Sequence, residues 1–186
     1  MNISTVDLDK TANTNYLCAE QRAKYLAFSN VSKVLELCVG PSLKVLETAY
    51  KAYKIDVWGN DIDARWFKYY PQGNWIQGDA LSVSYSNYDT IVFAPPLSKG
   101  CTGTREDSLS PLSVYPGYLE FLKRFSKEPK FKRGVLVLPG RSLSTKQDRK
   151  ETHRIINACA EVGIVQCHAL AIKGVNKYID LEVVRI

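Results

Sequence analysis

The sequence predicts an α/β fold with a seven-stranded, mostly parallel sheet, helices on both faces and a C-terminal antiparallel hairpin. Short β-branched runs alternate with longer helical patterns, which is typical of such a sheet. An apolar run ends at Gly40 and opens onto an amphipathic helix. The last two strands are separated only by residues 173–177, too short a segment for a helical crossover. The 186 residues fit a single domain, 1–186.

Each element follows from a local pattern. Apolar residues at helical spacing predict a crossover helix from Leu43 to Tyr53, with one face against the sheet. A second helix is expected from residue 144 or 145 to Gly163, and residues 14–30 are in rough helical register and should cap the sheet. We expect residues 1–15 to be mobile. Strands are predicted at residues 33–38, 55–58, 74–77, 90–93, 134–138, 163–172 and 178–185.

Composition narrows the class of protein. No apolar run approaches the roughly 20 residues that cross a bilayer, and the N-terminus does not resemble a signal peptide. The five cysteines are odd in number and form no C-x-x-C pair, which indicates neither a metal site nor a full disulfide set. We therefore expect a cytoplasmic protein that binds no metal and no membrane. The net charge of +6 favours polyanionic partners such as nucleic acid.

Residues 95–116 break the alternation of strands and helices, because Gly, Ser, Thr and Pro dominate them. An irregular connection of this length is uncommon unless it is functional or disordered. It follows a central strand at the edge where open α/β sheets bind ligands, so we expect a loop on the substrate side. A floppy insertion without a role is the alternative.

Acidic and small residues gather where the predicted strands end. Glu36 and Gly40 lie at the first strand and its turn, where a glycine allows close approach and a helix start offers N–H donors. Asp61 follows the second strand and can accept two hydrogen bonds from a ribose, with Asp63 in reserve. Asp79 follows the third strand and can accept from an adenine amine. The alternative is that these residues only cap backbone or form solvated turns.

Together these residues resemble the class I, Rossmann-like S-adenosylmethionine-dependent methyltransferases, over roughly residues 16–186. The family's first loop is usually E/D-x-G-x-G-x-G, and residues 36–42 keep the acid and the middle glycine, with Cys38 and Ser42 at the other two glycine positions. The resemblance implies S-adenosylmethionine as cofactor. It also implies a set of cofactor-binding residues: Glu36, Cys38, Gly40, Asp61, Ile62, Asp79 and Ala80.

The end of the fourth strand bears on the acceptor of the methyl group. Amino-methyltransferases of DNA or RNA bases carry (Asn/Asp/Ser)-Pro-Pro-(Tyr/Phe/Trp) at this position. Here Ala94, Pro95, Pro96 and Leu97 form a degenerate version, and the resemblance makes them the lining of the methyl-transfer site. Ala94 cannot accept through its side chain, and Leu97 cannot stack on a base. The alternative is that both prolines only terminate a buried strand.

The leading hypothesis is a methyltransferase whose acceptor is RNA or DNA. Basic residues and two tyrosines are predicted near the strand ends, where they could hold phosphates and stack bases. They are Lys99, Arg105, Tyr115, Tyr118, Arg141, Lys146, Arg149 and Lys150. Two alternatives stay open: a methyltransferase acting on small molecules or proteins, and a catalytically silent module that binds nucleic acid or a partner protein.

Overall fold

A computed structural model of the chain describes residues 5–95, 115–128, 132–140 and 146–186. Its centre is a seven-stranded sheet in the order β3-β2-β1-β4-β5-β7-β6. The pairs among β1 to β5 are parallel, whereas β7 runs antiparallel to both β5 and β6. The predicted fold class is confirmed. The strands are β1 (Lys33–Leu37), β2 (Asp56–Asp61), β3 (Trp75–Gln77), β4 (Thr90–Phe93), β5 (Arg133–Pro139), β6 (Ile164–Ile172) and β7 (Val175–Val184).

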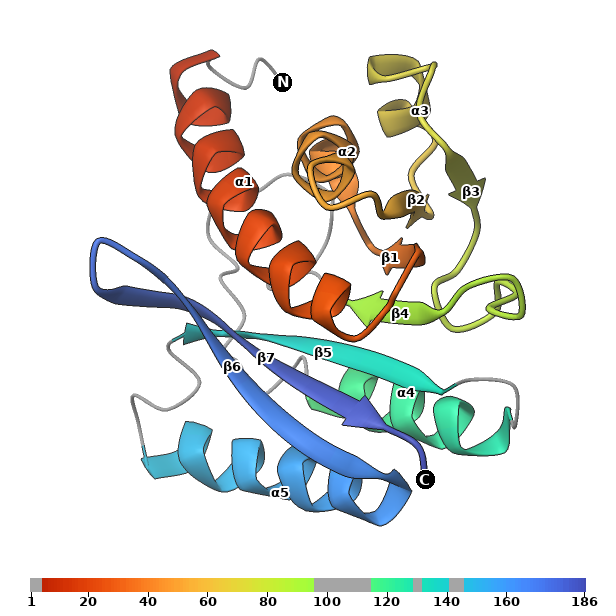
Figure 1. Ribbon diagram of the computed structural model, residues 1–186, viewed down its shortest axis with the longest axis vertical. Coiled ribbons are helices and arrows are strands. Elements are labelled where there is room, and N and C mark those ends of the chain that lie inside the picture. The colour runs from red at the N-terminus through yellow and green to blue at the C-terminus, as the bar shows by residue number, and fades with distance from the viewer. Residues whose placement is uncertain (1–4, 96–114, 129–131, 141–145) are drawn as a thin grey trace.

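Helices cover both faces of the sheet (Figure 1). On one face lie α1 (Thr5–Phe28) and α2 (Leu43–Lys51), and on the other lie α4 (Tyr115–Lys127) and α5 (Lys146–Val162). The short helix α3 (Arg65–Tyr69) follows β2, and a 3₁₀ turn, η1 (Gly40–Ser42), joins β1 to α2. The sheet is therefore the middle layer of three.

Each face has its own apolar core. On the α1 and α2 side, Leu26, Leu43 and Tyr50 are fully buried against the strands. On the α4 and α5 side, Phe121 and Ile155 are fully buried. The central strands contribute to both cores, because successive side chains of a strand point to opposite faces.

Two helices were not predicted. Helix α4 lies partly within and after residues 95–116, which the sequence indicated as an irregular loop. Its buried residues Tyr118, Phe121, Leu122 and Phe125 recur at helical spacing, so the signal was present in the sequence. Helix α3 has only five residues and no buried ones, and such a short element gives no periodic signal.

The two ends of α5 match the predicted helix closely. A Cβ atom at Gly163 would lie 2.3 Å from the carbonyl oxygen of Val184, so only glycine fits where the helix turns into β6.

The hairpin turn between β6 and β7 is shorter than predicted, because Lys173 and Gly174 take positive φ values of 52° and 75°. Positive φ at both central residues is the geometry of a tight two-residue hairpin.

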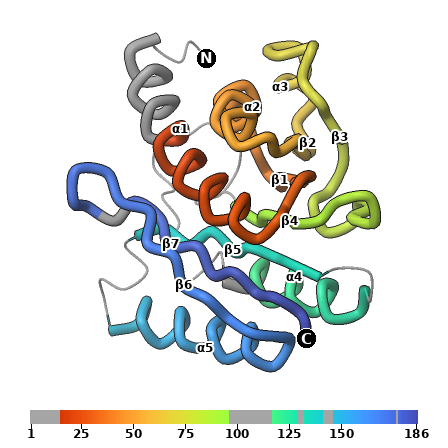
Figure 2. The backbone as a smooth tube through the Cα atoms, in the orientation of Figure 1, coloured from red at the N-terminus to blue at the C-terminus, as the bar shows by residue number. Residues whose placement is uncertain are grey.

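Helix α1 lies beside the C-terminal hairpin although the two are distant in sequence, as the backbone trace shows (Figure 2). The side-chain amide of Gln21 accepts from the backbone N–H of Ala171 at 3.1 Å and donates to its carbonyl at 2.9 Å. This amide pairs with the outer strand β6 much as another strand would. The contact fixes α1 against the β6 edge of the sheet.

Two expectations concern residues only partly described. Helix α1 begins at Thr5, within the stretch expected to be mobile, and residues 1–4 lie outside the described residues. Most of the predicted substrate-side loop, residues 96–114, also lies outside them. Within the described part of the chain, no helix has the length and apolar character needed to span a membrane.

Candidate functional site

The connection between β1 and α2 is a turn with unusual backbone geometry. Cys38 and Gly40 take φ values of 61° and 53°, both in the left-handed region. The N–H of Val39 donates to the carbonyl of Asn60 at 3.0 Å, which continues the pairing with β2 past the end of β1. A Cβ atom at Gly40 would meet only Trp66, at 4.0 Å, so the space above this glycine is open. The turn therefore exposes backbone at the carboxyl end of the sheet.

Asp61, the predicted ribose-binding acid, is tied to this turn. Its Oδ2 accepts from the N–H of Gly40 at 2.8 Å, and its Oδ1 accepts from the N–H of Asp63 at 2.9 Å. Strand β2 extends to Asp61, three residues beyond its predicted end, and the side chain is 8% exposed. Asp63, the reserve candidate, instead forms an ion pair with Arg65. Asp61 is thus the acid that lies beside Gly40.

The other residues predicted to bind the nucleoside lie at the ends of β2 and β3. Asp79 is exposed, and its Oδ1 accepts from the N–H of Leu81 at 2.8 Å. Ile62 is 67% exposed and Ala80 is 9% exposed. Since Asp61 pairs in register with Gln77, these side chains share one edge of the sheet.

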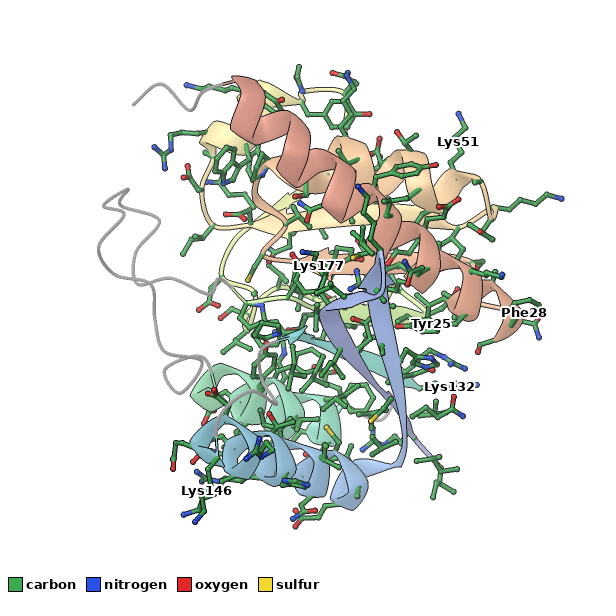
Figure 3. The ribbon with its side chains drawn as sticks, turned by 90° about the vertical axis from the view of Figure 1, so that its left-hand side faces the viewer. Tyr25, Phe28, Lys51, Lys132, Lys146 and Lys177 are labelled. Carbon is green, nitrogen blue, oxygen red and sulfur yellow. The ribbon has the colours of Figure 1, made fainter. Side chains whose placement is uncertain are left out.

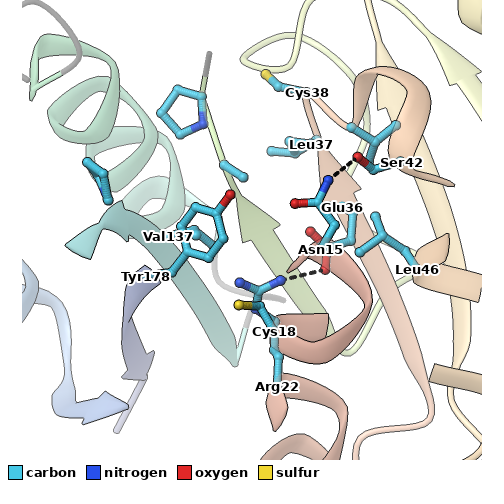
Figure 4. A pocket seen from close by; sticks show the side chains of 14 residues that line it. Asn15, Cys18, Arg22, Glu36, Leu37, Cys38, Ser42, Leu46, Val137 and Tyr178 are labelled. Carbon is cyan, nitrogen blue, oxygen red and sulfur yellow. Dashed lines mark hydrogen bonds and ion pairs between the residues drawn. The ribbon is translucent and has the colours of Figure 1, made fainter. Parts of the chain in front are cut away.

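A cavity of about 200 Å³ opens beside the turn, under helix α1 (Figure 4). Its lining brings together four residues that the sequence selected, Glu36, Cys38, Ala94 and Pro95. Gly40 and the acids at the ends of β2 and β3 are not part of the lining. The site therefore has two parts, a cavity at β1 and β4 and an edge at the ends of β2 and β3. Pro96 and Leu97 lie outside the described residues.

A buried charge cluster forms the floor of the cavity. The Arg22 guanidinium donates from Nε and Nη2 to the two carboxylate oxygens of Asp180, at 2.6 and 2.9 Å. Its Nη1 donates to Oε1 of Glu36 at 3.3 Å, and the Tyr50 hydroxyl donates to the same oxygen at 2.5 Å. The Tyr25 hydroxyl donates to Asp180 at 2.9 Å. The cluster joins α1, β1, α2 and β7.

The cluster carries two carboxyl groups against one guanidinium. Arg22, Glu36 and Asp180 are 4%, 2% and 0% exposed, so water screens their charges little. Burial raises the pKa of Glu36, although Arg22 and the Tyr50 hydroxyl oppose that shift. With both acids ionised, the floor of the cavity has one surplus negative charge and favours a cationic group above it.

Three side chains of this site were not found from the sequence: Arg22, Asp180 and Tyr178. Arg22 lies among Ala19, Ala23 and Leu26 on the buried face of α1. A single cation on an apolar helix face indicates a buried acidic partner, because an unpaired buried charge is very unfavourable. That signal could have revealed Arg22, whereas nothing local marks Asp180 as its partner across the sheet.

The structure corrects one prediction about the acceptor side. Tyr118 was expected to stack on bases, but it is fully buried between α4 and β5, and its hydroxyl donates to the carbonyl of Val137 at 2.6 Å. Lys146, Arg149 and Lys150 lie exposed on the first turns of α5, and Lys146 is seen extending from it (Figure 3). Lys99, Arg105 and Arg141 lie outside the described residues.

Comparison with known proteins gives similarity in structure only. No protein-family model matches the sequence, and no curated protein matches it. The fold is similar to magnesium protoporphyrin IX methyltransferase from Synechocystis PCC 6803 with bound SAM, at a TM-score of 0.62 and 13% identity over 100% of this chain and 86% of that one.

Two further solved structures show the same arrangement. One is the plantazolicin methyltransferase BpumL in complex with SAH, with a TM-score of 0.59 and 15% identity over 96% of this chain and 86% of that one. The other is the methyltransferase domain of bacterial CtHen1-CN, with a TM-score of 0.58 and 12% identity over 91% of this chain and 100% of that one. The chain therefore has the fold of the S-adenosylmethionine-dependent methyltransferases.

Proposed function

We propose that this protein transfers a methyl group from S-adenosylmethionine to a nucleic-acid acceptor, RNA or DNA. The observation that carries the proposal is the hydrogen bond between Gly40 and Asp61, in a turn whose neighbouring residues Cys38 and Ser42 line the cavity. It joins the glycine turn to an acid at the end of β2, where open α/β sheets bind nucleotide-like ligands. Solved structures with this fold hold SAM or SAH, which supports the same ligand class here.

The residues present fit this cofactor. An amino-acid end carries an ammonium group, and the Glu36 carboxyl group on the cavity floor would accept a hydrogen bond from it. An apolar cavity of about 150 Å³ holds one benzene. The cavity at β1, at about 200 Å³, therefore has room for an aliphatic amino-acid chain. At the ends of β2 and β3, the exposed Asp79 offers a carboxylate to the amine of a nucleoside, and the buried Asp61 lies beside Gly40, where the ribose hydroxyls would approach.

In this proposal the protein acts mainly by positioning. S-adenosylmethionine supplies a methyl group on an already activated sulfonium, so alignment accounts for much of the rate. Glu36 would hold the ammonium group, the Gly40 turn would lie against the backbone of the ligand, and Asp61 would hold the ribose. Ala94 and Pro95 line the cavity at the end of β4, where the acceptor would approach.

The nucleic-acid acceptor is supported by charge. The chain carries a net charge of +6, and Lys146, Lys150 and Lys177 are exposed on α5 and the hairpin. Phosphate contacts weaken steeply as salt increases. Binding of an RNA or DNA mixture that falls at least tenfold between about 50 and 200 mM salt would favour this acceptor. Binding that salt does not change would favour a small molecule or a protein as acceptor.

Calorimetric titration of S-adenosylmethionine and S-adenosylhomocysteine tests the cofactor site. We expect micromolar binding that Asp61→Asn weakens about tenfold or more, because the amide offers one acceptor oxygen instead of two charged ones. Asp63→Asn is the matched control and should leave binding unchanged, since Asp63 faces Arg65. Absence of binding to the folded wild-type protein would contradict the proposal and favour a silent binding module.

A further inference from the structure

Four half-buried tyrosines, Tyr16, Tyr53, Tyr88 and Tyr178, have hydroxyls that form no hydrogen bond within the described chain, and of these only Tyr178 lines the cavity. The hydroxyls of Tyr25, Tyr50, Tyr85 and Tyr118 each donate to a carboxylate or a backbone carbonyl. Buried tyrosine hydroxyls normally find such a partner. Tyr178, on β7, is half-buried, and its hydroxyl forms no hydrogen bond with any residue that the structure describes. A donor with this placement is available to a ligand.

The ring of Tyr178 points into the cavity, across from Glu36, Asn15 and Ser42 (Figure 4). Its backbone pairs with Pro139, at the end of β5. The cavity therefore has a charged floor made by the cluster and a neutral hydroxyl on the β7 side. Burial raises the pKa of Tyr178, so the phenol keeps its proton near neutral pH and acts as a donor.

Other polar groups of the cavity are partly engaged with one another. The amide of Asn15 donates to the hydroxyl of Ser42 at 2.8 Å. Arg22 donates from three nitrogens to two carboxylates, which more than balance its charge. An anionic group in this cavity would lie away from the two carboxyl groups of the floor, on the side where the Tyr178 hydroxyl can donate to it.

We propose that the Tyr178 hydroxyl binds the carboxylate of an α-amino-acid group whose ammonium lies toward Glu36. This inference rests on the proposed function, since the ligand that brings such a group is the amino-acid end of S-adenosylmethionine or S-adenosylhomocysteine. The ammonium and the carboxylate of one amino-acid group would then contact opposite sides of the cavity, at Glu36 and Tyr178. Tyr178 is then a specificity-determining residue, because it raises the affinity for ligands that carry this carboxylate over ligands that lack it.

The test compares three ligands that share adenosine and a thioether or sulfonium. S-adenosylhomocysteine has both amino-acid charges, decarboxylated S-adenosylmethionine keeps only the ammonium, and 5′-methylthioadenosine has neither. Calorimetry with Tyr178→Phe should show S-adenosylhomocysteine bound about tenfold more weakly or worse, as for one lost hydrogen bond to a charged group. The other two ligands should change less than about twofold.

Tyr53→Phe is the matched control, because it removes the same atom from a tyrosine after α2 that is not part of the cavity lining. It should leave the affinity of all three ligands unchanged. If Tyr178→Phe does not fold, the wild-type protein alone still tests the proposal. It should then bind S-adenosylhomocysteine more tightly than 5′-methylthioadenosine.

The outcomes separate the two proposals. Equal weakening of all three ligands by Tyr178→Phe, or no weakening of any, would overturn the role of Tyr178 while leaving the cofactor site intact. Equal wild-type affinity for S-adenosylhomocysteine and 5′-methylthioadenosine would also overturn it. Failure of the wild-type protein to bind any of the three would contradict the proposed function itself.

Discussion

The two parts of the site are built in different ways. The cavity depends on side chains that meet from distant elements, since Arg22 on α1 pairs with Glu36 on β1 and Asp180 on β7. The edge depends on backbone groups, since Asp61 accepts from the N–H groups of Gly40 and Asp63. Loss of one side chain should therefore destabilise the cavity. Ligand binding at the edge should instead depend on its backbone geometry.

The largest expected effect is at the cavity floor. Arg22→Met keeps much of the aliphatic stem but leaves two buried carboxyl groups without their cation. Removing one member of a buried ion pair costs about 3 to 5 kcal/mol of the free energy of unfolding. Urea unfolding at neutral pH measures this change. Arg154→Met, on the exposed face of α5, should change stability by less than about 0.5 kcal/mol.

A double variant sharpens this prediction. Arg22→Met combined with Asp180→Asn removes one of the two stranded charges and should recover part of the lost stability. A loss below about 1 kcal/mol for Arg22→Met alone would contradict a cavity held together by this cluster.

A smaller effect is expected where backbone geometry matters. Gly40→Ala forces a Cβ atom onto a residue with φ of 53°, which costs about 1 to 2 kcal/mol although the space is open. Gly174→Ala is the matched control, because Gly174 has φ of 75° and open space in the hairpin turn. Both variants should lose similar stability by urea unfolding. Only Gly40→Ala should also weaken S-adenosylhomocysteine, and equal binding by both variants would place the ligand elsewhere.

The smallest effect concerns Asp89, an acid held by local donors at the opposite end of β1. Its Oδ2 accepts from the Ser32 N–H and hydroxyl and from the Lys33 N–H, at 2.9, 2.7 and 2.8 Å. Burial alone would raise the pKa of Asp89, but these hydrogen bonds and the charge of Lys33 lower it overall. Because the side chain is exposed, Asp89→Asn should cost only about 1 kcal/mol at pH 7.

The sign of the pH effect follows from the lowered pKa. The unfolded chain binds its proton first as pH falls, so the Asp89 contribution is fully present above the unfolded value of about 3.9. It is lost as pH falls further, through the lower pKa of the folded protein. The stability difference between wild type and Asp89→Asn should therefore shrink below about pH 4 in urea unfolding. A difference that grows toward low pH would contradict this.

The same contrast explains what the sequence could predict. Gly40, Asp61 and Asp79 follow predicted strands, and the carboxyl ends of parallel strands meet at one edge, so their proximity follows from the fold class. The contact between Arg22 and Asp180 spans 158 positions, and only tertiary packing brings the two together. Tyr178 also escaped notice, because the predicted hairpin turn placed it at the start of a strand rather than within one.

Some elements were not predicted correctly because they are short, and others because of the composition of the sequence in or near them. Helix α3 is too short for a periodic pattern, whereas α4 has a clear apolar stripe that the preceding stretch rich in Gly, Ser, Thr and Pro obscured. The strand β2 was predicted three residues short because Gly59 and Asn60 are poor strand formers. Asn60 is nevertheless fully buried, with its amide donating to the carbonyls of Ile76 and Gly78.

A crystal structure of the protein with S-adenosylhomocysteine would test most directly whether the cavity and the edge form one site. We predict electron density for the amino-acid end inside the cavity, between Glu36 and Tyr178, and for the ribose against Asp61. An empty cavity with ligand elsewhere, or a protein that crystallises without ligand from saturating concentrations, would contradict the account.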